Sequence, residues 1–500
     1  MRQLNALDRM FLTQEAPGAP MHISFLMFYS QQSVRGGKVR LRDIVGTFRE
    51  RAALVPMLHE KVLEVPLGLD NPYWVNDPDL NVEAHLHHVA LPKPGDWRQL
   101  CILAARLHAR GIDRSRPLWE AYVIEGLDGI DFLPPRSFAI FLKMHHAAVD
   151  GMAALEAVRL LHDEDPRRPR ELSAEPAAEE AVPSRARLLG RAYLNTLRSP
   201  VRFAKLLGDL VPAATRLVEG VREHRFGEAP ELVATRFNGP ISSYRVIEST
   251  FFAVDELKSL RQAVEGATLN DVVVTIIGGA MRKYLQARGE YSDVSPLTVA
   301  PLSFRDASEQ GYGGNLVSAM IFPIHSEIEN PVERLAAVRK DSAAAKEMAQ
   351  AMGPRTALDL FQAIPPQLAS LAFLPSGTRM LSSTRMNTPV NTVITNVPGP
   401  RNTLYLAGAR LVSMAGFGPI MDSMGLFHAV MSYDGTLSIA INSCREMMPD
   451  PAFYADCIRA SFDELRRSGS ARRAAAPKKK ARTAVRRKTK PAPRARVRAG

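Results

Sequence analysis

The stretch His145-His-Ala-Ala-Val-Asp-Gly151 constrains the fold of this chain more than any other feature. An apolar run at 138–144, typical of a buried strand, precedes it, and a run at 152–161 with apolar residues at helical spacing follows it. Asp150 stands where the N-cap of that helix would fall. The pattern predicts a strand, a tight loop and a helix. Because histidine titrates near neutral pH, an imidazole held in such a loop can take a proton from a hydroxyl group and return it within one catalytic cycle.

Length and composition indicate a globular protein of two lobes. Five hundred residues are too many for one ordinary core, and 46% hydrophobic with 23% charged residues is usual for a globular chain. The three cysteines, Cys101, Cys444 and Cys457, form no CxxC pair, which favours a reducing cytoplasm and no cysteine chemistry. No apolar h-region marks the N-terminus and no apolar run approaches about 20 residues, so we expect neither a secretion signal nor a membrane span.

The net charge of +12 comes from the C-terminal tail. Residues 471–500 hold 13 of the 64 Lys and Arg residues and no acidic residue, which leaves 51 basic against 52 acidic residues in the rest of the chain. With almost no apolar residues the tail cannot build a core, and we expect 468–500 to be disordered. Such a charge run can bind anionic lipid headgroups or, non-specifically, the phosphates of DNA, and we favour the lipid surface.

Four regions follow one another along the chain. Residues 1–163 alternate strand-like and helical segments and are predicted to form a first lobe of an α/β or α+β fold. Residues 164–235 combine a Pro-rich linker with an amphipathic helical crossover, residues 236–467 are predicted to form a second lobe, and the tail at 468–500 follows. The strand-like segments of the first lobe are 22–28, 119–124 and 138–144, and its helical segments are 41–54, 97–109 and 152–161.

The crossover at 185–225 interleaves leucines with arginines. A basic amphipathic helix is a candidate for lying on an anionic membrane. The alternative, which we prefer, is a helical pair packed across the junction of the lobes. The chain has no Walker A loop and no G-x-G-x-x-G, so nothing indicates nucleotide hydrolysis or dinucleotide redox chemistry.

Residues 145–151 resemble the HHxxxDG signature of the acyl-CoA-dependent acyltransferases related to chloramphenicol acetyltransferase, which include the condensation domains of peptide synthetases. Further stretches resemble the bacterial wax ester synthase/diacylglycerol acyltransferase family, and the resemblance spans about residues 4 to 466. These stretches are Leu7-Asp8-Arg-Met-Phe11-Leu12 with Glu15 and Pro20-Met21-His22, Pro117-Leu118-Trp119, Phe237-Asn238-Gly-Pro240-Ile, Asn270-Asp271 and Thr395-Asn396-Val397-Pro398-Gly399-Pro400.

The resemblance implies two chloramphenicol acetyltransferase-like lobes, each a mixed sheet flanked by helices, with a tunnel between them. Long-chain acyl-CoA would enter from one mouth, and diacylglycerol or a fatty alcohol from the other. It also implies an acyltransferase that makes triacylglycerol or wax esters and needs no cofactor, since acyl-CoA is a substrate. We expect such an enzyme in the cytoplasm, at the surface of the inner membrane or of lipid inclusions.

Within the signature, the resemblance implies that His146 is the general base, although a core histidine is the alternative. His145 is expected to point the other way as a packing or orienting group. Asp150 is either an orienter of the histidine or, as the superfamily's pattern implies, the partner of an arginine, for which Arg305 is a candidate. Gly151 is expected to let the backbone pass tightly into the helix.

Three residues outside the signature are predicted to line the tunnel. Trp119 would shape its wall, Asn270 would donate a hydrogen bond into it, and Asp271 would fix the start of a helix. Helix capping alone explains the last two nearly as well. Asn396 is expected to have a mainly structural role in a turn at the lobe crossing.

The cluster of His85, His87 and His88 suggests a metal at first sight. These histidines alternate along a strand-like run with no cysteine and no spaced carboxylate, so they offer no closed ligand set, and we predict no metal. Two alternatives to the leading function remain. One is a related acyltransferase or condensation enzyme with another hydroxyl acceptor, and the other is a catalytically silent tether on lipid granules.

Overall fold

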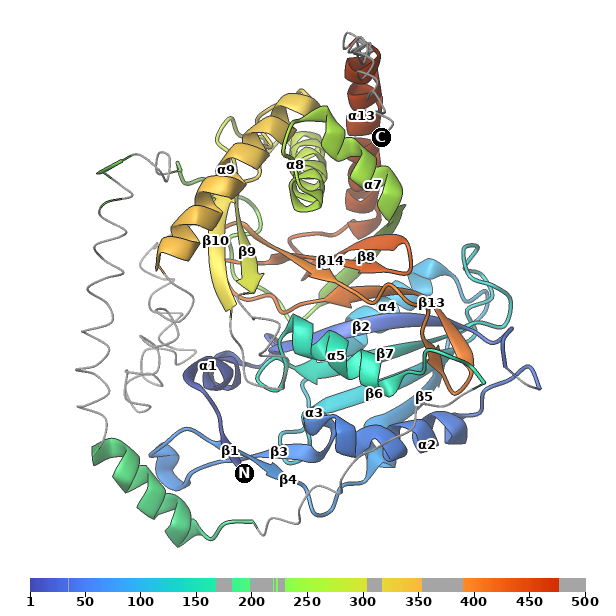
Figure 1. The fold of residues 1–500 in the computed structure, drawn as a ribbon, viewed down its shortest axis with the longest axis vertical. Helices are drawn as coiled ribbons and strands as arrows, with labels where there is room; N and C mark the ends of the chain where they lie inside the picture. The colour runs from blue at the N-terminus through green and yellow to red at the C-terminus, as the bar shows by residue number, and fades with distance from the viewer. Residues whose placement is uncertain are drawn as a thin grey trace, which may run out of the picture.

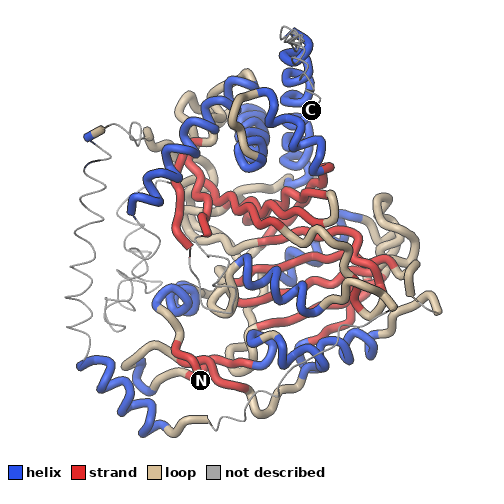
Figure 2. Tube along the Cα trace, in the orientation of Figure 1, coloured by secondary structure: helices blue, strands red, loops and turns tan. Residues whose placement is uncertain are grey.

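The computed structural model describes residues 1–34, 36–167, 182–197, 219, 222–223, 230–303, 317–352 and 390–475. Within these ranges, two six-stranded sheets and one three-stranded sheet are surrounded by helices (Figures 1 and 2). The two large sheets form the two lobes, so the mixed α/β fold expected from the sequence is confirmed.

The first large sheet has the strand order β12-β13-β2-β7-β6-β5. Only β5 and β6 pair in parallel, and all other neighbours are antiparallel. Strands β2 and β7 are buried along their whole length, because helices cover both faces of the sheet. The bounds are β2 His22–Ser30, β5 Leu86–Ala90, β6 Trp119–Glu125, β7 Phe138–His145, β12 Tyr405–Leu406 and β13 Ala409–Phe417.

The second large sheet has the order β10-β9-β11-β14-β15-β8. Strand β11 pairs in parallel with both of its neighbours, and the remaining pairs are antiparallel. The bounds are β8 Arg245–Ala253, β9 Leu297–Ser303, β10 Val317–Pro323, β11 Thr392–Pro398, β14 Leu426–Tyr433 and β15 Thr436–Cys444.

Helices cover the sheets, and a small sheet lies beneath the first lobe (Figure 1). The small sheet has the order β1-β4-β3, with bounds β1 Arg2–Gln3, β3 Glu60–Leu63 and β4 Tyr73–Asn76. The helices are α1 Ala6–Gln14, α2 Leu41–Arg51, α3 Pro56–His59, α4 Trp97–His108, α5 Gly151–Leu161, α7 Val254–Leu260, α8 Leu269–Ala287, α9 Pro331–Met352 and α13 Pro451–Ala475, with short 3₁₀ turns at Ala52–Leu54, Pro66–Gly68, Val82–His85 and Arg261–Ala263.

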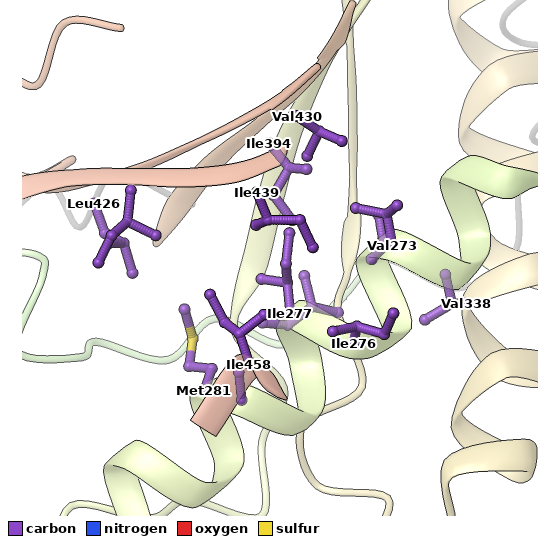
Figure 3. Close-up of a cluster of buried hydrophobic side chains, with 14 of the residues drawn as sticks. Val273, Ile276, Ile277, Met281, Val338, Ile394, Leu426, Val430, Ile439 and Ile458 are labelled. Atoms are coloured by element: carbon purple, nitrogen blue, oxygen red, sulfur yellow. The ribbon is translucent and has the colours of Figure 1, made fainter. Parts of the chain in front are cut away.

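Helix α8 is the centre of the second lobe. It is buried between the sheet on one side and helices α9 and α13 on the other. Ile276 and Ile277 lie in one cluster with Ile394 and Ile439 of the sheet (Figure 3). The sequence of α8 is apolar over most of the helix circumference, so the helix can be covered from several sides, as is usual for a buried helix.

The second half of the chain supplies two strands to the first sheet. We expected residues 236–467 to form the second lobe alone, but β12 and β13 cross over and complete the first sheet by pairing with β2. This pairing satisfies backbone groups that β2 would otherwise leave open at a sheet edge. Leu411 and Phe417 of β13 pack into the two cores on either face of the first sheet.

The end of α13 and the packing of the crossover helix also differ from expectation. Helix α13 runs to Ala475, past residue 467, because the sequence there is rich in the strong helix formers Ala and Arg. A helix at 185–197 packs on the small sheet of the first lobe and not across the lobe junction. Residues 476–500, and most of the crossover beyond 197, lie outside the described part of the chain.

Candidate active site

The histidine pair lies where a central strand of the first sheet ends. Strand β7 ends at His145. The backbone N–H of His145 donates to the carbonyl of Leu118, 3.0 Å away. The next residue, His146, donates its backbone N–H to the carbonyl of Met21 at 2.9 Å. The loop is therefore tied to the segments on both sides of β7. Helix α5 begins at Gly151, so the predicted strand, loop and helix are confirmed.

Asp150 is the N-cap of helix α5. Its Oδ1 accepts a hydrogen bond from the N–H of Ala153 at 2.8 Å, which satisfies one of the free donors of the first turn. Arg305, a candidate partner of Asp150, lies outside the described residues. The cap fixes the direction in which the chain leaves the loop, and with it the position of the two histidines.

His145 is wholly buried and faces Glu15. Its Nδ1 accepts from the N–H of Ala147 at 3.0 Å, so in the neutral ring the proton is on Nε2. Nε2 lies 3.6 Å from Oε2 of Glu15. Burial lowers the pKa of His145, and the contact with Glu15 offsets this only in part. His145 is therefore a neutral group in a fixed orientation at neutral pH.

Glu15 is held between His145 and Arg114. The Nε and Nη2 atoms of Arg114 donate to Oε2 of Glu15 at 2.9 and 2.6 Å, and Nη2 also donates to the carbonyl of Leu12. Burial alone would raise the pKa of Glu15, but the contacts with His145 and Arg114 outweigh it and lower this pKa to about 2. The carboxylate is charged throughout the physiological range and ties the N-terminal segment to the histidine loop.

His146 is half-buried, and its ring stacks on Phe11 of helix α1. The two ring centroids are 4.0 Å apart and the planes differ by 13°. One face of the imidazole is therefore covered by an aromatic ring, which restricts its rotation. A base must keep its orientation toward the acceptor hydroxyl, and a stacked neighbour provides this without using a ring nitrogen.

Helix α1 is itself fixed against the loop. Asn5 caps the helix by accepting from the N–H of Asp8 at 2.7 Å. Leu4 and Leu12 share a small apolar cluster with Ala147 of the histidine loop, and Phe11 packs against it. The N-terminal segment is thus one packed unit with the loop.

Sequence reasoning assigned no role to Phe11, Glu15 or Arg114. The first two lie in the N-terminal motif that carries the family resemblance, so the motif itself was a signal that these residues matter. Arg114 lies outside the motifs that resemble the family, and its approach to Glu15 depends on the tertiary fold.

Residues of three separate sequence motifs contact one another where the two lobes meet. An added Cβ on Gly151 would lie 3.2 Å from Cγ2 of Val397 in β11, so the start of α5 packs closely on the second lobe. The neighbouring Asn396 donates from Nδ2 to Oδ1 of Asn270 at 3.4 Å. In the turn after β11, an added Cβ on Gly399 would lie 2.0 Å from the carbonyl oxygen of Ser432, so only glycine fits there.

Asp271 is the third residue of helix α8 and completes a capping box with the N-cap residue Thr268. Its Oδ2 accepts from the N–H and the Oγ1 of Thr268, both at 2.8 Å, and its Oδ1 accepts from Ser342 at 2.6 Å. These bonds occupy both carboxylate oxygens and give Asp271 a structural role. Asn270 is only partly buried and contacts Asn396 across the lobe crossing, and its hydrogen bond into a tunnel stays a prediction.

Trp119 lies in the core of the first lobe. Its side chain is 0% exposed, stacks on Phe48 and His85, and donates from Nε1 to the carbonyl of Leu58 at 3.1 Å. These contacts give it a packing role beneath the sheet. Its place in a tunnel wall stays a prediction.

The three clustered histidines have separate neighbours. His85 pairs through Nδ1 with the carbonyl of Trp119 at 2.8 Å, His87 stacks on Tyr122, and His88 lies 3.3 Å from Glu125. Over the ranges that the structure describes, no group of three His, Cys, Asp or Glu side chains is placed to hold a metal ion.

A buried polar network joins the lobes on the His145 side of the first sheet. Its central residue is His108 of α4. The Nδ1 atom of His108 forms a hydrogen bond with Oγ of Ser24 at 2.8 Å, and its Nε2 atom accepts a hydrogen bond from Nδ2 of Asn442 at 3.1 Å. His22, opposite His145 in the sheet, bonds the carbonyl of His108 at 2.6 Å. Burial lowers the pKa of His108 to about 3 and that of His22 well below its usual value. Both rings are neutral and already bonded, which leaves His146 as the better candidate for a base.

The histidine loop lies where two sheet-containing lobes meet, and solved condensation domains have the same two-lobed fold. The first condensation domain of the calcium-dependent antibiotic synthetase, solved with a substrate analogue, superposes with a TM-score of 0.55 at 14% identity, covering 94% of this chain and 97% of that one. At this identity the likeness shows the fold alone.

The sequence comparisons give the family. The wax ester synthase/diacylglycerol acyltransferase catalytic domain matches residues 4–273, and the C-terminal domain of the same family matches residues 313–466. This chain belongs to that family and is an acyltransferase. A Mycobacterium tuberculosis relative named as a diacylglycerol O-acyltransferase is 30% identical over 468 residues, covering 93% of this chain and 90% of the relative. The solved wax ester synthase/diacylglycerol acyltransferase of Marinobacter aquaeolei has a TM-score of 0.65 at 23% identity, covering 94% of this chain and all of that one.

Proposed function

We propose that this acyltransferase moves a long-chain acyl group from CoA to the hydroxyl of diacylglycerol or of a fatty alcohol, with His146 as general base. A nitrogen of His146 takes the proton from the acceptor hydroxyl while the oxygen attacks the thioester carbonyl. The tetrahedral intermediate collapses with cleavage of the C–S bond, and the CoA thiolate takes the proton back from His146. Atoms balance without a covalent enzyme intermediate and without a cofactor.

One observation carries the proposal. His146 lies directly after β7, in the signature loop of an acyltransferase family. The imidazole is half-buried, and one of its faces stacks on the ring of Phe11. In the proposed mechanism Phe11 is a positioning residue, because it fixes the imidazole plane. Glu15 acts one step further away, since it orients His145 and thereby the loop that both histidines share.

Product analysis tests the proposal and separates the acceptors. Purified protein is given palmitoyl-CoA with diacylglycerol or with a long-chain alcohol, and the lipid products and free CoA are measured. Triacylglycerol, wax ester or both are expected to form in amounts equal to the CoA released. CoA release equal to a no-acceptor control, with no ester product, would remove both acceptors and favour another hydroxyl.

The same proposal places the enzyme on a lipid surface, because its acceptors are insoluble in water. No helix in the described ranges is long and apolar enough to cross a membrane. We propose peripheral attachment to the inner membrane or to lipid inclusions, with the basic tail at 476–500 contributing by attraction to anionic headgroups. Non-specific binding of the tail to DNA is the competing role.

A silent tether on lipid granules would give a different result. Such a protein has no need of a base, so replacing His146 would leave its behaviour unchanged. The helix cap at Asp150 and the Glu15–His145 contact keep the loop in a defined geometry, and this favours catalysis over tethering.

A further inference from the structure

The helix at 185–197 has one apolar face that packs and a second that does not. Leu188 and Ala192 are buried against Val65, Tyr73 and Val75 of the first lobe. On the outer side, Leu189, Tyr193 and Leu197 recur every four residues and therefore form one stripe. Leu197 is nine positions after Leu188, about two and a half turns, so it lies opposite Leu188. Leu189 and Tyr193 lie about 100° and 140° around the helix from Leu188, so the stripe runs from the flank of the packed side to its opposite side.

The outer stripe is exposed. Leu189 is 38% exposed, Tyr193 67% and Leu197 58%, and the neighbouring Leu194 is 51% exposed. Large apolar side chains gathered on one exposed face of a helix are typical of a surface that meets another apolar phase. In Figure 1 this helix is the unlabelled green one at the lower left edge of the molecule, beside the small sheet.

The charges of the helix fit an anionic surface. Arg185, Arg187 and Arg191 are exposed, and residues 185–197 include no Asp or Glu. An apolar stripe with tyrosine and flanking arginines matches the layered chemistry of a lipid interface, where acyl chains lie beneath anionic headgroups.

The helix is joined to the first lobe by side-chain contacts. It begins after Ser184, whose carbonyl accepts the first intrahelical bond from the N–H of Leu188 at 3.1 Å. At the other end, Nδ2 of Asn195 donates to Oδ2 of Asp70 at 2.6 Å. The small sheet on which the helix packs also carries Trp74, which shares an apolar cluster with Leu12 of α1 and Ala147 of the histidine loop.

We infer that the outer face of residues 185–197 inserts its Leu189–Tyr193–Leu197 stripe into the headgroup region of an anionic lipid surface, and so holds the first lobe against the phase that contains the acceptor. This inference rests on the proposed function, because an enzyme with a water-insoluble acceptor has to reach a lipid surface. It assigns lipid contact to a folded helix, separately from the basic tail.

The test compares three full-length proteins: wild type, the double variant Tyr193→Ser/Leu197→Ser, and the control Tyr244→Ser. Tyr244 is also 67% exposed but lies in the second lobe just before β8. Co-sedimentation with vesicles of phosphatidylcholine and phosphatidylglycerol is measured in roughly 0.1 M and roughly 1 M salt, because the higher salt shortens the Debye length to about 3 Å and screens the tail.

Wild type and Tyr244→Ser should keep part of their vesicle binding at high salt, and the double variant should bind at least about tenfold more weakly there. Equal binding by all three at high salt would overturn the inference. Sedimentation without vesicles gives a second check, since conversion of a wild-type dimer to a monomer by the double variant would make the stripe a self-association surface instead. Circular dichroism confirms folding of each variant.

Transfer from palmitoyl-CoA to a water-soluble short-chain alcohol separates this inference from the proposed function. The double variant should match wild type in that assay and lose activity only with acceptor presented in vesicles. A wild type that releases no CoA with any acceptor would contradict the proposed function, while the vesicle measurement would still decide the role of the helix.

Discussion

The ring of Phe11 lies 4.0 Å from the ring of His146 and only 13° from parallel with it. The two residues are far apart in the sequence and come from α1 and from the loop after β7. This stack, with the Glu15–His145 contact beside it, makes the N-terminal helix part of the candidate active site. Removal of either contact should lower the activity of protein that is still folded.

Phe11→Ala should lower kcat by about 10- to 100-fold, because the imidazole loses the surface that fixes its plane and small misplacements of a catalytic group are costly. Phe11→Tyr, which keeps the ring, should recover most of the rate. Steady-state kinetics with palmitoyl-CoA separates kcat from KM, and the change should lie in kcat. If KM rises while kcat stays at the wild-type value, Phe11 contacts the substrate and does not position the base.

Glu15→Gln should change how stability depends on pH. The folded pKa of Glu15 is lowered from 4.5 to about 2, so the ionised carboxylate stabilises the fold above about pH 4.5, and this is lost as the pH falls through about 2. In urea unfolding, the gap in free energy between wild type and Glu15→Gln should be largest near neutral pH and shrink in acid.

Glu156→Gln is the matched control for Glu15, because Glu156 forms an exposed ion pair with Arg159 at 2.8 Å. An exposed pair contributes little, so this variant should unfold like wild type at every pH. A gap for Glu15→Gln that stays constant as the pH falls from about 4.5 to about 2 would show that its charge does not stabilise the folded state.

Asp150→Ala should lower the free energy of unfolding by about 0.5–2 kcal/mol, the usual cost of losing an N-cap. Asp150→Asn should cost less, since asparagine caps almost as well. Asp96→Ala, which removes the cap of α4, is the control and should lose similar stability without a change in kcat. If Asp150→Ala melts like wild type and yet has no turnover, Asp150 orients the base and is not mainly a cap.

Deletion of residues 476–500 should leave transfer to a soluble short-chain alcohol unchanged and weaken binding to anionic vesicles at low salt. Basic residues near an anionic surface contribute up to about 1 kcal/mol each, and salt screens the attraction. Vesicle co-sedimentation and a gel shift with duplex DNA measure the two partners side by side. Unchanged vesicle binding together with loss of the DNA shift would assign the tail to nucleic acid.

Local signals predicted the elements around the site well. The alternation and spacing near 138–161 gave strand β7 and helix α5 to within a residue, and the position of Asp150 gave the cap. The contacts that define the site are not local. Phe11 and Glu15 reach the histidines only through the tertiary packing of α1, and no spacing in the sequence indicates that approach.

The same limit explains the crossing of β12 and β13 into the first sheet. Their sequences are those of ordinary strands, and the partner of a strand depends on which edge is open once the rest of the sheet has formed. The amphipathic pattern at 185–197 was visible in the sequence. That its second apolar face stays exposed follows only from the packing of Leu188 and Ala192 on the small sheet.

The most direct test of the account compares His146→Ala with His145→Ala in one assay of CoA release from palmitoyl-CoA, at equal folded concentration. His146→Ala should lose about 10²- to 10⁴-fold in turnover, the usual contribution of a general base, with thermal unfolding close to that of wild type. His145→Ala should retain more activity and lose more stability, since that ring is wholly buried beside Glu15. A folded His146→Ala protein with wild-type turnover would contradict the mechanism, and a greater loss of turnover in His145→Ala would reverse the two roles.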